Sequence, residues 1–551
     1  MTTAWVKRPY TTVGQDHLAA RAVSERIYAT LLPGITNVTD RARYYSFYPW
    51  LAWAMDQQGR SLAKADVIDT LRRAECLVTL VAAVHARDSA GDSGVAHDEG
   101  LVGRTALTKA LPALFGGGAV RLSDYAHQDP TKAETRYFKN PKGGLGQYYL
   151  GPLSDLGVLA ATDDRGRVFG YTLAGKEVAK AFDLGVDRHR FFEVLDGDEV
   201  TLVLLRSLAS FCACRCRADD VENRATIATL LTPTSGDRRI AALRRRATLL
   251  TVLDLAETRA QAGQSLTVDV FRAALYSGAA RSGAAWQQPP VAQLVAPHWR
   301  TYQRGEMLSV AVQSLLWLVC TTLAEEGEGV ARTGDALIQL AMDVIEPVLE
   351  ELPPTYRGFL ASREQAQPAL MDWESPHHEL QLTRRVLASS RGKTPDQAQR
   401  AQVAREVLEL LMALSARTNT TRGYGELQFG RAYLSTYRIN LVELDRLSEQ
   451  TWIDLSMVDW VRWLLRHWVV ERHLAVALRK LRSQGNDTFR FRPHDQGLTY
   501  VGWTDTLQPT YSSPRLRQAF AILRDLGLLS ASDGGWVPTA RGRALLAAAD
   551  A

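Results

Sequence analysis

Apolar residues recur at spacings of three and four over most of this chain, which is the pattern of amphipathic helices. Strand-type alternation is rare and is clearest in TFRFR, residues 488–492, where Phe alternates with polar residues. The pattern therefore predicts a mainly α, multi-domain helical protein with few short strands. The clearest helical stretches are residues 19–32, 65–86, 200–211, 308–323 and 458–481.

Length and composition limit the class of protein. A chain of 551 residues is long enough for three or four domains, and 46% hydrophobic with 23% charged residues is typical of globular proteins. The start of the chain has no apolar signal-peptide core, and no uninterrupted apolar stretch is long enough to span a membrane. Five scattered Cys fit a reducing compartment. We therefore expect a soluble cytoplasmic protein without a membrane partner.

Two segments of the chain resemble each other. Residues 153–179 read LSDLGVLAATDDRGRVFGYTLAGKEVA, and residues 523–545 read LRDLGLLSASDGGWVPTARGRAL. Each predicts a helix that stops at Gly, then a strand, a polar turn, a second strand and a helix capped by Thr172 or Thr539. This order of elements resembles a winged-helix module.

The winged-helix resemblance implies contact with DNA, because such a module can place a helix in the major groove and a hairpin on the backbone. Packing or dimerisation is the alternative role. The expected domains are an N-terminal helical domain (1–125), a first winged-helix-like module (126–185), a central helical region (186–420) and a C-terminal helical region ending in the second module (421–551). Basic residues near the first copy that can contact phosphates are Lys139, Lys142, Arg165 and Arg167.

The loop before the first module is rich in glycine. It reads YFKNPKGGLGQYY, residues 137–149, and combines three Gly with two Lys. Such a loop can grip a phosphate through its backbone, although it lacks the Gly-Lys-Ser/Thr ending of a P-loop. A flexible connector is the alternative interpretation.

Cysteine and histidine residues give no recognised metal-binding spacing. In CACRC, Cys212 and Cys216 are expected on one face of a helix as small buried side chains, because no paired Cys-x-x-Cys or His-x-x-x-His completes a ligand set. The donors of DWESPHHE, Asp372 to Glu379, lie in a Pro-broken loop. We therefore predict neither a metal nor a cofactor, with metal binding by either segment left open.

The densest unusual segment is GITNVTDRARYYSFYPWLAW, residues 34–53. Asn37 or Thr39 can cap a helix that begins at Asp40, and Pro49 should interrupt or kink it. Six aromatic residues crowd within ten positions, more than packing of one helix face requires. Aromatic rings and guanidinium groups stack on an extruded base, and a carboxylate beside them can stabilise a sugar cation. The predicted site residues are Asp40 as catalytic group, Tyr44, Tyr45 and Tyr48 as walls of a base pocket, and Arg41 and Arg43 as base or phosphate contacts.

That segment has an alternative interpretation as a helix buried on several faces, with Asp40 a favourable charge at its start.

A second aromatic and basic segment spans residues 452–503. Its arginines either line a nucleic-acid channel or form a solvated face over an aromatic core. They are Arg462, Arg466, Arg490 and Arg492.

Several classes of function remain. The lack of a P-loop disfavours an ATP-driven motor, whereas base excision requires neither ATP nor metal. Segments 34–50, 299–313 and 472–491 look like large proteins of bacterial phage-defence loci, among them an anti-phage DNA glycosylase that removes glucosylated cytosine. That resemblance implies that the chain is an anti-phage DNA glycosylase and that its partner is double-stranded, modified phage DNA. A non-catalytic DNA-binding regulator and a helical scaffold subunit are the alternatives.

Overall fold

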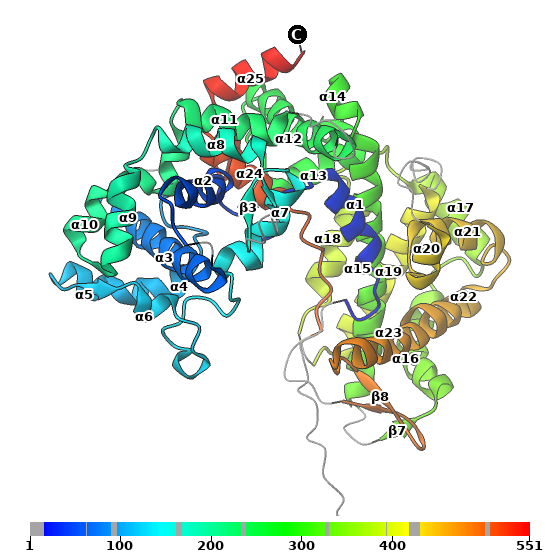
Figure 1. Cartoon of the computed structure of the whole chain (residues 1–551). Coiled ribbons are helices and arrows are strands. Elements are labelled where there is room, and N and C mark those ends of the chain that lie inside the picture. The colour runs from blue at the N-terminus through cyan, green and yellow to red at the C-terminus, as the bar shows by residue number, and fades with distance from the viewer. Residues whose placement is uncertain are drawn as a thin grey trace, which may run out of the picture. The chain divides into compact units, whose positions relative to one another are not determined.

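A computed structural model of the chain describes residues 16–61, 63–89, 96–160, 168–232, 239–325, 330–392, 394–417, 430–501 and 507–550. Helices make up most of these residues, and the strands are two to four residues long (Figure 1). The predicted mainly α class is therefore confirmed.

The chain divides into two compact units. Unit 1 contains Met1–Tyr28, Arg272–Gln287 and Ala296–Ser512, and unit 2 contains Ala29–Phe271, Gln288–Val295 and Ser513–Ala551. These boundaries differ from the expected ones at residues 125, 185 and 420, because sequence-distant segments pack together. In particular, the C-terminal segment belongs with residues 29–271.

The described part of unit 2 is built from helices and three two-stranded β elements. Strand β1 pairs with β4, β2 with β3, and β10 with β11, all antiparallel. The elements are α2 (Tyr44–Gln57), α3 (Lys64–Asp88), α4 (Arg104–Leu107), α5 (Leu111–Phe115), β1 (Val120–Arg121), α6 (Ser123–Ala126), α7 (Leu150–Asp155), β2 (Leu159–Ala160), β3 (Gly170–Tyr171), α8 (Leu173–Asp183), α9 (Arg188–Gly197), β4 (Glu199–Val200), α10 (Leu202–Ser207), α11 (Val221–Leu231), α12 (Arg239–Gln261), α14 (Pro290–Gln293), α24 (Leu516–Asp525), β10 (Leu529–Ser532), β11 (Gly535–Pro538) and α25 (Ala540–Asp550).

Unit 1 is organised around one long helix, α15 (Ala296–Glu325). This helix packs against α16 (Gly334–Leu349), α18 (Glu379–Ser389) and α19 (Gln397–Ala416). A three-stranded sheet has the order β7-β9-β8, and β5 pairs with β6. The division between units falls within α1 (Ala22–Leu31) and α13 (Val268–Ser277). The elements of unit 1 are β5 (Ala279–Arg281), β6 (Ala284–Ala285), α15 (Ala296–Glu325), β7 (Ala331–Arg332), α16 (Gly334–Leu349), α17 (Tyr356–Ala366), α18 (Glu379–Ser389), α19 (Gln397–Ala416), α20 (Arg431–Thr436), α21 (Leu441–Gln450), α22 (Met457–Trp463), α23 (Glu471–Gln484), β8 (Phe491–His494) and β9 (Gly497–Tyr500).

Helix α15 is long and apolar enough to cross a membrane, but 89% of its most apolar window is buried inside the fold. Its burial is that of a core helix. The cytoplasmic location stays a prediction.

The core of unit 2 is aromatic. Trp50 of α2 packs against Phe182, Phe191 and Phe211, with ring centroids 5.0–5.3 Å apart, and its indole N–H donates to Asp183. Contacts of this kind bury large apolar areas and also satisfy the polar atom of Trp. They fix α2 against α8, α9 and the turn that precedes Cys212.

In their described residues, both repeats contain the predicted helix, two paired strands and second helix, and both join them with the same hydrogen bonds. In the first, Gly157 has φ +75°, and the Thr172 hydroxyl donates to the Gly157 carbonyl and accepts from the Gly175 N–H. In the second, Gly527 has φ +71°, and Thr539 makes the same two bonds, to Gly527 and from Gly542. A left-handed Gly and a Thr cap therefore define each hairpin-to-helix junction.

Three local predictions differ from the structure. Helix α2 begins at Tyr44 and not at Asp40, and the Ala42 N–H in the loop before it donates to Asp525. It also continues through Pro49. The strand expected at residues 488–492 begins only at Phe491, because the Arg490 N–H donates to the His473 ring.

Candidate metal centre and basic cleft

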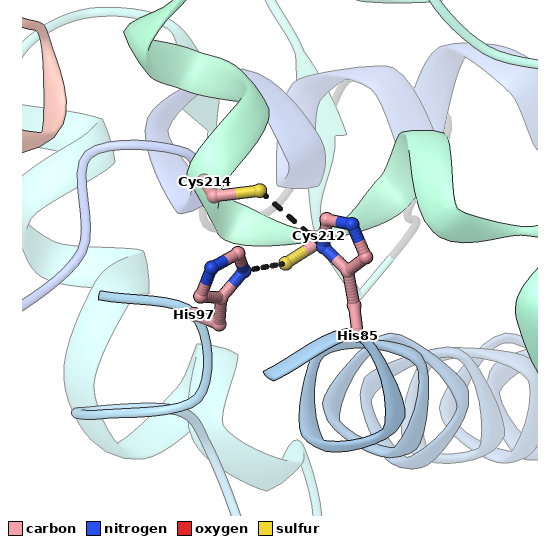
Figure 2. Close-up of side chains that lie close together, drawn as sticks. All are labelled: His85, His97, Cys212 and Cys214. Atoms are coloured by element: carbon pink, nitrogen blue, oxygen red, sulfur yellow. Dashed lines mark hydrogen bonds between the residues drawn. The ribbon is translucent and has the colours of Figure 1, made fainter. Parts of the chain in front are cut away.

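Two histidines and two cysteines of unit 2 converge on one point (Figure 2). One ligand-type atom from each of His85, His97, Cys212 and Cys214 lies within 4.8 Å of all the others. The Cys212 sulfur is 3.6 Å from His97 Nδ1, and the Cys214 sulfur is 3.5 Å from His85 Nδ1. His97 and Cys212 are buried, whereas His85 and Cys214 are partly buried. Soft sulfur and imidazole donors at such spacing can hold a transition metal.

The backbone around the cysteines explains why two of them point the same way. Cys212 is extended, with φ −61° and ψ 138°, and it separates a 3-10 turn over Ala209–Phe211 from another over Ala213–Arg217. The sequence instead predicted a continuous helix with Cys212 and Cys216 on one face. Because Cys212 interrupts that helix, Cys214 joins it in the cluster, and Cys216 is buried outside it.

The cluster perturbs the two thiols in opposite directions. A hydrogen bond with Cys212, together with the charges of His85 and His97, lowers the pKa of Cys214 to about 5 against the opposing effect of burial. The same hydrogen bond, with burial, raises the pKa of Cys212. These opposite shifts favour the thiolate at Cys214 over that at Cys212, and the thiolate is the form of Cys that binds metals.

Arg41 holds the loop that carries His97. Its guanidinium donates to the carbonyls of Ala96, His97 and Glu99 at 2.9–3.1 Å, and its Nε donates to Asp525 at 2.7 Å. The side chain is 1% exposed. The predicted base or phosphate contact is thus occupied inside the protein.

Arg43 performs the same task for the cysteine turn. It donates to the carbonyls of Ser210 and Cys212 and forms a two-pronged ion pair with Glu222, at 3.0 and 3.1 Å. The two arginines of the DRAR sequence therefore fix both loops that bring ligands to the cluster. Both arginines were predicted to contact a base or a phosphate, but in the structure their partners are groups of the protein itself.

The three tyrosines of the predicted base pocket lie in the closed core, each at most 2% exposed. Tyr44 accepts the Val102 N–H, Tyr45 donates to the Gly34 carbonyl, and Tyr48 donates to Glu75. The cavity lined by Tyr44 measures about 10 Å³, room for about one water. Among the described residues, this cavity is too small for an extruded base, and all three tyrosine side chains are enclosed by the fold.

Asp40, the predicted catalytic carboxylate, is partly buried and accepts a hydrogen bond from Gln518 at 3.0 Å. It lies in the loop before α2 and not at a helix start. Its role in base excision stays a prediction.

The glycine loop binds a carboxylate of the protein itself, that of Glu75. The N–H groups of Gly144 and Leu145 each donate to the buried Glu75 carboxylate at 2.8 Å, and Tyr48 and Tyr137 donate to it as well. A Cβ on Gly143 would lie 2.4 Å from that carboxylate. The loop is thus shaped for close backbone approach, as predicted, but to Glu75 in place of a phosphate.

A cleft on the surface of unit 2 gathers basic side chains. It has a volume of about 660 Å³, and we call it the basic cleft. Its charged lining residues are Arg104, Lys109, Arg136 and Lys139 against one carboxylate, Glu134. Phe138, Tyr148 and Gln147 also line it. Lys139 is exposed, as predicted, while Lys142 donates to the Val168 carbonyl. Arg165 and Arg167 fall outside the described residues.

The arginines predicted to line a channel in unit 1 have partners of their own. They are paired as follows: Arg462 with Glu346, Arg466 with Asp335, Arg492 with Asp487, and buried Arg490 with the His17 ring. This arrangement fits the alternative interpretation, in which an Arg face covers an aromatic core.

The acidic and histidine segment at residues 372–379 does not form a ligand cluster in the described part of the chain. Buried Glu379 accepts from Tyr276 at 2.6 Å and from Arg417 at 2.9 Å. His378 caps α18 and binds the Leu370 carbonyl. These groups are satisfied by the fold.

Comparisons with known protein families, with curated proteins and with solved structures found no match to this chain. The winged-helix and phage-defence resemblances therefore stay predictions. The sites described above are the grounds on which a function can be proposed.

Proposed function

We propose that this chain binds double-stranded DNA and that the basic cleft holds the phosphate backbone. The excess of cations in the cleft carries this proposal. Four basic side chains line it with one carboxylate, and of the four Arg104 is paired outside the lining, with Asp98. Lys and Arg contacts to phosphates supply most of the affinity of non-specific DNA binding. Arg104, Lys109 and Lys139 are exposed, so their charged groups can reach a phosphate.

The first repeat supports a duplex as the partner. A helical stretch, π-helical over Leu145–Tyr149 and then α7, leads into the first hairpin, and Gln147 and Tyr148 at its start line the cleft. In winged-helix proteins, the N-terminal part of the helix before the wing contacts bases in the major groove. Phosphates bound in the cleft would bring a groove to this helix start, where Gln147 can contact base edges.

The second repeat has a different role in this proposal. Apart from Arg517, the polar side chains of α24 are buried or partly buried, and Asp525 is paired with Arg41. Leu266 adds a bridge to β11 through two hydrogen bonds with Trp536, each 2.9 Å. A helix enclosed in this way cannot enter a groove. We therefore assign packing to the second copy and DNA contact to the first.

The proposal is tested by fluorescence anisotropy with a labelled 30-base-pair duplex over a range of salt concentrations. Arg136→Gln/Lys139→Gln should weaken binding at least tenfold and reduce the salt slope by about two, one for each lost phosphate contact. Arg224→Gln, which removes an exposed charge from α11 outside the cleft, should bind like the wild type. Equal affinity of the cleft variant and the wild type would overturn the proposal.

The same complexes test the predicted base excision. Ordinary and glucosyl-hydroxymethylated duplexes are incubated with the protein and then treated with alkali, which cleaves at abasic sites. Alkali-labile breaks that Asp40→Asn abolishes would support a glycosylase. Binding without such breaks would leave the DNA-binding proposal intact and favour a non-catalytic regulator.

A further inference from the structure

We propose that His85, His97, Cys212 and Cys214 bind one zinc ion in a closed tetrahedral site. This inference is independent of DNA binding, since none of the four residues lines the basic cleft. It concerns the cluster shown in Figure 2, where all four side chains point inward.

The spacing of the donors matches the ion. Zinc bonds of about 2.0–2.3 Å at tetrahedral angles place ligand atoms about 3.3–3.8 Å apart. The two sulfur–nitrogen pairs are already at 3.5 and 3.6 Å, and the widest separation in the cluster is no more than 4.8 Å. Binding thus requires inward shifts of about 1 Å at most.

The donor types select the metal and its role. Two thiolates with two imidazoles suit zinc, whereas magnesium and calcium prefer oxygen ligands. Four protein ligands complete the tetrahedron and leave no position for water or substrate, which is typical of structural zinc. The ion would tie together the end of α3, the loop at His97 and the turn at Cys212.

The surroundings of the cluster have the features of a metal site's outer shell. Arg41 binds the carbonyl of His97, and Arg43 binds the carbonyl of Cys212, so one residue of each ligand-bearing loop is fixed by a buried guanidinium. Both guanidiniums are neutralised, by Asp525 and Glu222. Groups that orient the ligands in this way commonly raise metal affinity.

Metal content of the full-length chain tests the proposal. Protein purified without chelators should contain one zinc ion per chain, as measured by inductively coupled plasma mass spectrometry. Cys214→Ala and His85→Ala should each lower that content at least fivefold. Cys216→Ala is the matched control, because Cys216 belongs to the same turn but not to the cluster, and it should retain the zinc.

A second measurement on the wild type does not depend on how the variants fold. Cobalt exchanged into the site should give the visible absorption of tetrahedral cobalt with sulfur-to-cobalt charge transfer, and added zinc should abolish it. A zinc content near zero, equal zinc in wild type and Cys214→Ala, or a Cys212–Cys214 disulfide in the purified protein would each overturn the proposal.

Discussion

Arg41 and Asp525 form a buried ion pair, with Arg41 Nε 2.7 Å from Asp525 Oδ2, although 484 positions separate them in the sequence. Asp525 belongs to the second repeat, and it also accepts the Ala42 N–H at 3.1 Å. The pair therefore ties the segment before α2 to the C-terminal repeat within unit 2. Through the carbonyls that Arg41 binds, it also fixes the loop of His97.

Arg41→Gln should lower the free energy of unfolding by about 2–4 kcal/mol, because buried Asp525 would lose its closest ion pair and keep only Arg524, at 3.0 Å, as a charged partner. Urea denaturation measures this change. Arg517→Gln, an exposed position on α24, should change stability by less than about 0.5 kcal/mol. Equal midpoints for the two variants would contradict a structural role of the pair.

The double variant Arg41→Leu/Asp525→Leu refines that test. It removes both charges, so neither remains buried and unpaired, and part of the stability should return relative to Arg41→Gln. It should not restore the hydrogen bonds to the loop of His97, so a reduced zinc content is expected if the loop geometry sets metal affinity.

Glu75→Gln should destabilise unit 2 by about 1–3 kcal/mol, because a side-chain NH₂ would face donors in place of an acceptor. Both carboxylate oxygens accept a backbone N–H, from Leu145 and Gly144, and a backbone N–H cannot reverse its role. Amide hydrogen exchange at these two positions should quicken together with the loss of stability. Unchanged exchange at both positions would show that the glycine loop does not depend on Glu75. Glu134→Gln, a substitution at an exposed position, serves as the control.

Gly175→Ala and Gly542→Ala should each cost about 1–3 kcal/mol, because a new methyl would overlap the backbone. An added Cβ would lie 2.0 Å from the Val158 carbonyl oxygen or 2.3 Å from that of Leu528. Gly197→Ala, at the exposed last residue of α9, meets nothing within 4 Å and should instead stabilise by about 0.5–1 kcal/mol. Thermal unfolding of the three variants gives the comparison, and similar signs for all three would refute the close-approach explanation.

Stability should decrease as the pH falls from about 6.5 towards 3, because burial lowers the pKa of His473 to about 3. The Arg490 N–H donates to His473 Nε2 at 2.8 Å, an arrangement that requires the neutral ring. In the unfolded chain the ring binds a proton below its ordinary pKa of about 6.5, so the unfolded state binds more protons than the folded state. The free energy of unfolding therefore falls by about 1.4 kcal/mol for each unit by which the pH is lowered.

His473→Gln should flatten this part of the pH profile, since Gln can accept the same N–H without titrating. His17, whose pKa is also lowered by burial and whose ring accepts from the Arg490 side chain, should leave a residual slope. Denaturation between pH 4 and 7 measures both, and an unchanged slope in His473→Gln would contradict the assignment.

The residues singled out from the sequence are important in the structure, but several have other partners than expected. Arg41, Arg43 and the glycine loop bind internal carboxylates and carbonyls, whereas the sequence predicted phosphates or a base. The histidine–cysteine cluster was missed because its donors come from three segments. The available signal was a Cys-x-Cys pair and two His twelve positions apart, His85 and His97, neither of which is a recognised zinc spacing.

The sequence by itself determined the helical class and the form of both repeats, because helix periodicity, a left-handed Gly and a Thr cap act within a few residues of each other. Only the tertiary structure decided which charges meet, as in Arg41 with Asp525, and which donors converge, as in His85 with Cys214. The reason is physical. A buried charge or metal ligand requires a partner, but the packing of the whole unit, and not local conformation, decides which residue along the chain becomes that partner.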